Sequence, residues 1–208
     1  LACLSARQVS TNGEGLVLAS NLFFNSDPFD NSMEVGFSID SGLTWTNAWI
    51  QSVTSAWGAA VISNLLPCQI SALSSISNGS PQTNFAAFQW NTKLTPSIAG
   101  TISGARLRIR LWNGDYWSAS ITSSPFLVDN EAPSSALAAI APQYSAGGPY
   151  SIGSSLAFSW SGFADSGSGI AGYYYSLTNR EGSSTGFWSA AVTAVINGLT
   201  FDVTNRIY

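Results

Sequence analysis

Apolar and polar residues alternate most regularly at positions 105–112, where the chain reads ARLRIRLW. Successive side chains of a β-strand point to opposite faces, so this alternation directs one set of residues into a core and the other set toward solvent. The pattern predicts a half-buried strand. Its solvent-facing residues are Arg106, Arg108 and Arg110, and its core-facing residues are Leu107, Ile109 and Leu111.

The next residues predict a hairpin. Asn113 and Gly114 open the segment NGDY, and an Asn-Gly pair favours the tight turn in which both central residues have positive φ. Residues 117–128, WSASITSSPFLV, would then form the returning strand. We therefore expect two antiparallel neighbouring strands between 105 and 128.

Other apolar runs are rich in β-branched and aromatic residues and are separated by Gly, Asn, Asp and Ser. Such runs are typical of strands joined by turns. Only 71–77 and 134–142 could be taken for helices, and both segments are short and lack capping residues. We expect an all-β chain, with further strands in 15–24, 33–39, 154–163, 171–178 and 193–201.

A domain boundary is indicated at 126–135, FLVDNEAPSS, where an apolar strand ends in consecutive polar residues. Pro133 has no N–H to donate to a strand ladder, which is typical of a linker. The sequence thus predicts a first domain at 1–128, a linker at 129–133 and a second domain at 134–208.

Composition limits the classes of partner. Charged residues make up 9% of the chain and aromatic residues 12%, and the net charge is -4 with 7 Lys and Arg. The aromatic content favours a folded chain, and the small number of basic residues argues against nucleic acid as a partner. No apolar run approaches the roughly 18–20 residues of a membrane-spanning helix, so we expect no membrane-spanning segment.

Residues suited to catalysis are few. The chain has no His, and its single lysine, Lys93, has no recognisable serine motif nearby. We predict that the protein is not an enzyme. The two cysteines, Cys3 and Cys68, are too few for a zinc site but could form one disulfide in an oxidising compartment.

The segment FSIDSGLTWT at 37–46 resembles the Asp-box, a pattern that recurs in the blades of sialidase-like propellers. That resemblance implies a compact turn that usually lies away from an active site. A propeller would also need many more strands than this chain can supply. We therefore interpret the segment as a structural turn formed by Ser38, Asp40, Gly42, Thr44 and Trp45.

Two segments indicate an internal repeat. Residues 33–49 and 171–192 both run from an aromatic-Ser pair through a Gly-containing turn to a Trp. Ser38 would correspond to Ser176, and Trp45 to Trp188. The second copy lacks the Asp of the turn, which weakens any catalytic interpretation of that residue.

Four segments resemble the tandem immunoglobulin-like or fibronectin type III-like repeats of large bacterial surface and secreted proteins. They are FSIDSGLTWTNA, FLVDNEAPSS, DSGSGIAGYYYSLTN and NGLTFDVTNRIY. The resemblance implies two tandem β-sandwich domains and an extracellular or cell-surface location. It also implies that 204–208 begins the penultimate strand of the second sandwich, so this sandwich would lack its last strand or strands. Either the chain is a fragment, or a neighbour supplies the missing strand.

Two functions follow from this resemblance. The first is a structural repeat unit of a surface protein or filament, acting as a spacer or assembly module whose partners are other copies or neighbouring repeats. The alternative is an adhesin or carbohydrate-binding accessory module. Its sugar site could be formed by exposed aromatic residues, although Trp residues usually pack in cores. The candidates are Trp49, Trp57, Trp112 and Trp117.

The arginines of the alternating strand are a second candidate site. Arg106, Arg108 and Arg110 could bind a carboxylated or sulfated glycan, since guanidinium groups present paired donors to such anions. The other interpretation is a solvated strand face whose charges find acidic partners. The acidic residues considered are Glu14, Asp27, Asp30 and Glu34.

Calcium is the one cofactor considered; otherwise we expect none. Asp129, Asn130 and Glu131 hold oxygen ligands at close spacing, and they resemble part of the calcium-bearing linkers of cadherin-type repeats. Linker chemistry alone explains the same three residues.

Overall fold

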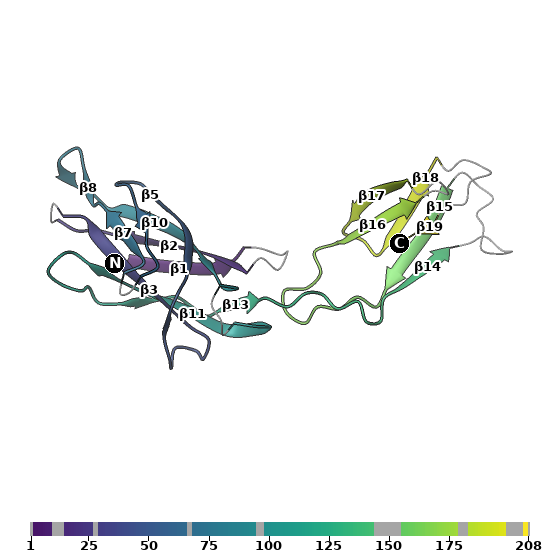
Figure 1. The fold of residues 1–208 in the computed structure, drawn as a ribbon, viewed down its shortest axis with the longest axis horizontal. Helices are drawn as coiled ribbons and strands as arrows, with labels where there is room; N and C mark the ends of the chain where they lie inside the picture. Colours follow the sequence, from purple (N-terminus) through teal and green to yellow (C-terminus); the bar gives the residue numbers. More distant parts are fainter. Residues whose placement is uncertain are drawn as a thin grey trace. The chain divides into compact units, whose positions relative to one another are not determined.

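The structure, a computed structural model, contains no helix in the part of the chain that it describes (Figure 1). The all-β prediction is therefore confirmed. The chain divides into two compact units, Leu1–Ala132 and Pro133–Tyr208, and the division falls inside the predicted linker. The described residues are 2–9, 15–26, 29–65, 68–94, 98–143, 155–178, 183–198 and 206–207.

The first unit contains a four-stranded antiparallel sheet in the order β1-β2-β10-β5. Strand β2 confirms the predicted strand at 15–24, whereas the other three strands were not predicted. The bounds are Ala2–Gln8 for β1, Leu16–Phe23 for β2, Ile50–Ser55 for β5 and Asn84–Asn91 for β10.

The second sheet of this unit has the strand order β12-β11-β3-β7-β6, with β13 also paired to β11 and β4 to β3. A separate hairpin joins β8 (Ile76–Ser77) to β9 (Ser80–Pro81). The sheet strands are β3 (Asn31–Ser38), β4 (Thr46–Asn47), β6 (Val61–Ile62), β7 (Ile70–Leu73), β11 (Thr101–Trp112), β12 (Ile121–Thr122) and β13 (Phe126–Asp129).

The two sheets share one hydrophobic core. Inward residues of β3 and β10 meet there, and the Phe37 ring stacks on the Trp90 ring with 4.7 Å between centroids. Strand β11 confirms the predicted alternation, because its aliphatic residues are buried and its arginines are half-buried on the opposite face. This arrangement is a β-sandwich, the packing expected when two sheets each have one apolar face.

The turn after β11 differs from the predicted hairpin. Gly114 has a positive φ of 104°, but Asn113 is not among the residues with positive φ. Instead, the Asn113 side-chain oxygen accepts N–H bonds from Asp115 and Tyr116, at 3.1 and 2.8 Å. The prediction of a tight Asn-Gly turn was therefore wrong, because the Asn113 side chain closes a wider loop. The returning chain pairs with β11 through the Trp112–Trp117 bridge and through two short strands, β12 and β13.

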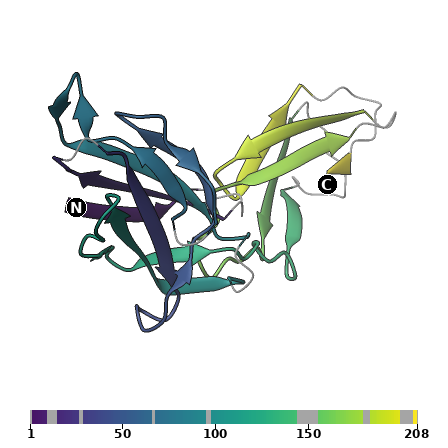
Figure 2. The ribbon, with the colours of Figure 1, turned by 60° about the vertical axis from the view of Figure 1, so that its left-hand side comes forward.

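The second unit, green to yellow in Figure 2, contains two antiparallel three-stranded sheets. Their strand orders are β14-β15-β18 and β17-β16-β19. Strands β15, β16 and β18 lie within the three segments predicted as strands. The bounds are Ala139–Gln143 for β14, Ser155–Ser161 for β15, Tyr173–Thr178 for β16, Ser184–Ser189 for β17, Thr193–Asn197 for β18 and Arg206–Ile207 for β19.

The core of the second unit is small and aromatic. Its buried residues, among those described, are Phe158, Trp160 and Ile196. The ring of Tyr175 packs edge-on against Phe158, with 5.2 Å between centroids, and Tyr173 packs edge-on against Trp160 at 5.3 Å. Residues from both three-stranded sheets therefore meet in this core.

Candidate functional site

The turn at 38–44 is held by the carboxylate of Asp40. Hydroxyl donors reach it from Ser38 and Thr44, both at 2.6 Å, and the backbone N–H groups of Leu43 and Thr44 donate to it at 3.1 and 2.9 Å. These bonds, led by the one from Ser38, hold the pKa of Asp40 well below its usual range. The carboxylate is thus engaged in closing the turn.

The backbone of this turn needs a residue without a β-carbon. Gly42 has a φ of 100°, a conformation that side chains resist, and its N–H donates to the Ser38 hydroxyl at 2.7 Å. Trp45 follows the turn, and its ring packs close to Gly42 and Gly36. The turn therefore brings its Trp onto the outer face of the β3–β11 pair.

On that face the arginines of β11 cover tryptophan rings. We call the set formed by Arg106, Arg108, Arg110, Trp45 and Trp117 the arginine–tryptophan face. The Arg108 guanidinium lies 4.4 Å from the centroid of Trp45, and the Arg110 guanidinium lies 4.1 Å from that of Trp117. Each pair is a cation–π contact. The turn and the arginine strand, predicted as separate features, thus form one surface.

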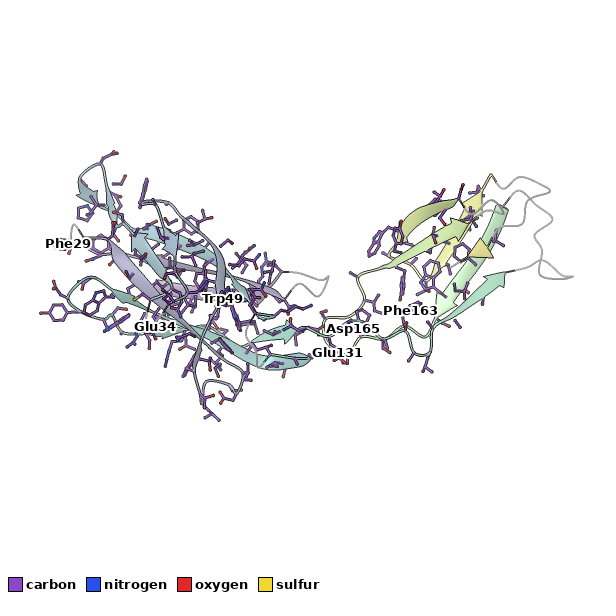
Figure 3. The ribbon with its side chains drawn as sticks, viewed as in Figure 1. Phe29, Glu34, Trp49, Glu131, Phe163 and Asp165 are labelled. Carbon is purple, nitrogen blue, oxygen red and sulfur yellow. The ribbon has the colours of Figure 1, made fainter. Side chains whose placement is uncertain are left out.

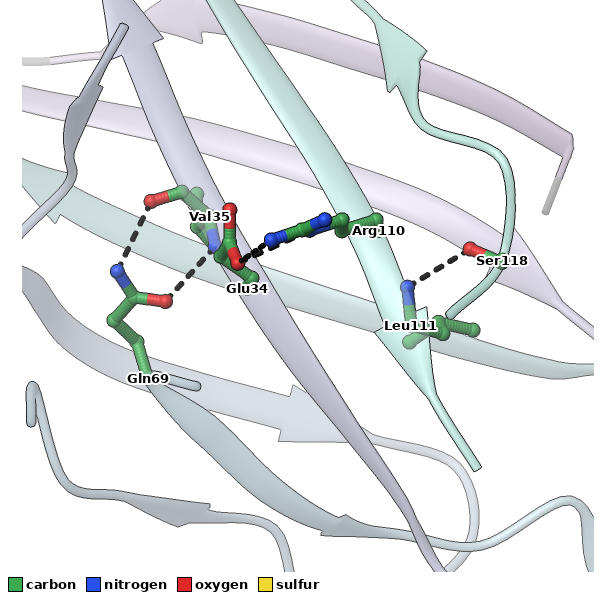
Figure 4. Close-up of polar contacts among 6 residues, drawn as sticks. All are labelled: Glu34, Val35, Gln69, Arg110, Leu111 and Ser118. Carbon is green, nitrogen blue, oxygen red and sulfur yellow. Dashed lines mark hydrogen bonds and ion pairs between the residues drawn. The ribbon is translucent and has the colours of Figure 1, made fainter. Parts of the chain in front are cut away.

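Arg110 also has an acidic partner. Its Nη2 and Nε donate to Glu34 Oε2 at 2.6 and 3.0 Å, which are charge-assisted bonds (Figure 4). Arg106 donates from Nη1 to the Ser123 carbonyl at 3.2 Å. The Arg110–Glu34 ion pair therefore supports the interpretation of a strand face whose charges have acidic partners. Of the other acidic residues considered, Glu14 and Asp27 lie outside the described residues.

Next to Glu34, a buried amide ties β3 to the segment before β7. Gln69 accepts the Val35 N–H at 2.9 Å and donates to the Val35 carbonyl at 3.2 Å, so its side chain imitates a strand neighbour (Figure 4). Cys68 precedes it, and burial together with Glu34 raises the pKa of the Cys68 thiol. Cys68 is a free thiol. The predicted disulfide between Cys68 and Cys3 was therefore wrong.

The calcium candidates belong largely to the first unit. Asp129 is the buried last residue of β13, not part of a linker, and its Oδ1 accepts bonds from Thr101 and from the Glu131 N–H. The Asn130 side-chain oxygen accepts a bond from Thr92 at 3.0 Å. Among the described residues, no group of three or more His, Cys, Asp or Glu could hold a metal ion. Hydrogen bonding within the fold thus explains Asp129 and Asn130.

The tryptophans proposed as a sugar site do not gather into one surface. Trp112 and Trp117 pair across the turn after β11, with 5.4 Å between ring centroids. Trp49 (labelled in Figure 3) and Trp57 are both exposed, and they lie on segments before and after β5. Trp117 lies beneath Arg110, so its ring is partly covered.

The second unit contains a cavity that the sequence analysis did not predict. Its volume is about 240 Å³, and Phe163 (labelled in Figure 3) is one of its lining residues. Trp160 also lines it, and its buried Nε1 has no hydrogen-bond partner among the described residues. The cavity is therefore lined mainly by apolar and aromatic side chains. The other lining residues include Pro133, Ile140, Phe158, Tyr173 and Tyr175.

Comparison with models of known protein families and with curated protein sequences finds no match for this chain. In the part of the chain that the structure describes, no helix could cross a membrane.

Proposed function

We propose that the chain is a structural repeat unit of an extracellular surface protein or filament, built from immunoglobulin-like sandwiches. The strand order of the first unit supports the immunoglobulin-like description. In one sheet β1 pairs with β2, which pairs with β10; in the other, β3 pairs with β11, which pairs with β13. Immunoglobulin-like folds likewise pair their first two strands in one sheet and their third, sixth and seventh strands in the other.

The second unit repeats part of this order. Its strands follow the order β14-β15-β18 as the first unit follows β1-β2-β10, and β16 pairs with β19 as β3 pairs with β11. In the first unit, β12 and β13 lie on the far side of β11. No described strand takes the corresponding position beside β19. The shared part of the order supports the proposal that both units are immunoglobulin-like sandwiches.

The cavity of the second unit is the observation on which an assembly role depends. Its walls are largely aromatic, and one lining residue, Trp160, has a buried Nε1 with no hydrogen-bond partner among the described residues. Leaving a buried donor unpaired costs about 1–3 kcal/mol, so an inserted strand with a backbone carbonyl and an apolar side chain would relieve that cost. We therefore propose that a strand from a second copy completes this unit.

Light scattering of the purified chain over a range of concentrations tests the assembly role. Ile140 lines the cavity and is 45% exposed, so Ile140→Lys brings a charge to the cavity without replacing a buried residue. We expect the parent chain to associate as concentration rises and the variant to stay monomeric. Val192→Lys is the matched control, because Val192 is 49% exposed in the same unit and does not line the cavity.

If the parent chain is monomeric at every concentration, the assembly role is rejected and the spacer role is retained. The same conclusion would follow if Val192→Lys abolished association as fully as Ile140→Lys, because the effect would then come from added charge alone.

A further inference from the structure

Two large aromatic side chains face solvent on the second unit. Tyr174 of β16 and Trp188 of β17 are direct cross-strand partners, and they are 74% and 64% exposed. We call them the aromatic pair. Rings of this size contribute most when they are buried, so two adjacent exposed rings on a regular sheet need an explanation.

Glycines hold the aromatic pair against the sheet. The Trp188 indole lies across Gly172, and the Tyr174 phenol lies across Gly186; a β-carbon at either glycine would overlap the ring. Glycine within or next to a strand often marks such a close approach. With one side of each ring against the backbone, the other side is available to a ligand.

Hydroxyl groups continue the same face. Side chains alternate along a strand, so Ser176 lies on the Tyr174 side of β16, and Ser184 lies on the Trp188 side of β17. Ser176 pairs with Gly186, two residue pairs along the ladder from the aromatic pair. Among the described residues of β16 and β17, none is charged. The surface thus combines exposed rings with neutral hydroxyl groups.

The aromatic pair also differs from two tryptophans of the first unit. Trp45 and Trp117 are half-buried, and they lie beneath Arg108 and Arg110. Tyr174 and Trp188 are 74% and 64% exposed, and among the described residues no guanidinium lies over either ring. The exposed surface of these two rings is therefore open to a ligand that stacks.

We propose that the aromatic pair binds a neutral oligosaccharide made of pyranose rings. A pyranose has an apolar face of C–H groups that packs on an aromatic ring, and its hydroxyls can bond to neighbouring serines. The area favours a small ligand, because two aromatic rings supply about 300–500 Å² whereas a stable protein interface needs roughly 800 Å² from each partner. This site goes beyond the assembly role, and it adjoins the cavity, because Tyr174 and Gly172 also line the cavity whereas Trp188 does not.

Isothermal titration calorimetry with cellohexaose, laminarihexaose and mannohexaose as probes tests the proposal. We expect saturable binding of at least one of them. Replacing Tyr174 or Trp188 by Ala should weaken that binding about tenfold or more, since each ring supplies one stacking surface. Trp49→Ala is the matched control, because Trp49 is an exposed tryptophan of the first unit, and its binding should equal that of the parent.

Conservative variants separate loss of the site from loss of the fold. Tyr174→Phe and Trp188→Phe keep a ring at each position and should retain most of the affinity. Gly186→Ala keeps both rings but displaces the Tyr174 phenol, so it should weaken binding. Circular dichroism would check that each variant stays folded.

Three results would overturn the proposal. The first is that none of the three probes binds the parent chain, and the second is that the alanine variants bind as well as the parent. The third is that the Tyr174→Ala, Trp188→Ala double variant loses self-association without any change in glycan binding, which would assign the aromatic pair to a protein interface. Failure of the assembly test would leave this experiment unaffected.

Discussion

The two units share part of their strand order but differ in how they protect their aromatic rings. In the first, Trp90 is fully buried between the sheets, while Trp45 and Trp117 lie beneath arginines. In the second, Trp160 lines a cavity and Trp188 is mostly exposed. A shared scaffold therefore does not determine a shared surface, because the side chains on the outer strands decide which rings a partner can reach.

The cores differ for a related reason. Strand β11 spans twelve residues and brings alternate aliphatic side chains into the first core along its length. Among the described residues of the second unit, the buried core consists of Phe158, Trp160 and Ile196. In this part of the chain, fewer apolar groups meet between the sheets, and less surface is removed from water. We expect the first unit to be the more stable of the two.

The largest effect should follow from removing the ring at the centre of the first core. Trp90→Ala deletes a fully buried side chain that stacks on Phe37, and such deletions cost about 3–5 kcal/mol. Urea denaturation should show this loss in the first-unit transition only. The exposed Trp49→Ala should change stability by at most about 0.5 kcal/mol. Equal losses for both variants would contradict the assigned core.

A smaller loss should follow from Asp40→Asn, which removes the charge that closes the turn. The folded-state pKa of Asp40 is lowered, so its contribution is fully present above the unfolded pKa of about 3.9 and is lost as pH falls through the folded value. The melting temperature of the variant should thus be lower near neutral pH. The difference in melting temperature between parent and variant should narrow in strong acid, when the parent carboxylate is protonated. A gap that did not depend on pH would contradict this explanation.

Arg108→Met should lower stability modestly and should clearly increase the solvent exposure of the Trp45 ring. It removes the cation–π contact with Trp45, which is worth about 0.5–1 kcal/mol at an exposed site. Acrylamide should then quench tryptophan fluorescence more strongly, because the first unit would have an uncovered ring like Trp188. Arg7→Met makes the same chemical change at an exposed residue of β1 and should alter neither property. Unchanged quenching in Arg108→Met would mean that the guanidinium does not shield the ring.

The smallest effect should come from removing divalent cations. The Asp129 and Asn130 side chains are already bonded to Thr101 and Thr92. A chelator should therefore leave the melting temperature of both units unchanged. A lowered melting temperature that calcium restores would instead favour the calcium hypothesis.

Sequence patterns identified many of the strands but missed several. Strand β11 was predicted because its arginines and aliphatic residues alternate by type. Strand β10 was missed because its first two residues reverse that rule: Asn84 is buried and Phe85 is exposed. Asn84 can be buried because its amide bonds to the Trp57 and Ser74 carbonyls, at 3.0 and 2.5 Å. Partners so distant in the chain are invisible to a local pattern.

The candidate sites divide in the same way. The sequence by itself determined the Asp40 turn, because its bonds join residues no more than four positions apart and depend on local geometry alone. Only the tertiary structure decided that Arg108 would cover Trp45, and that Tyr174 and Trp188 would lie side by side across two glycines. Those contacts depend on strand register, and a shift of one residue would turn every side chain to the opposite face.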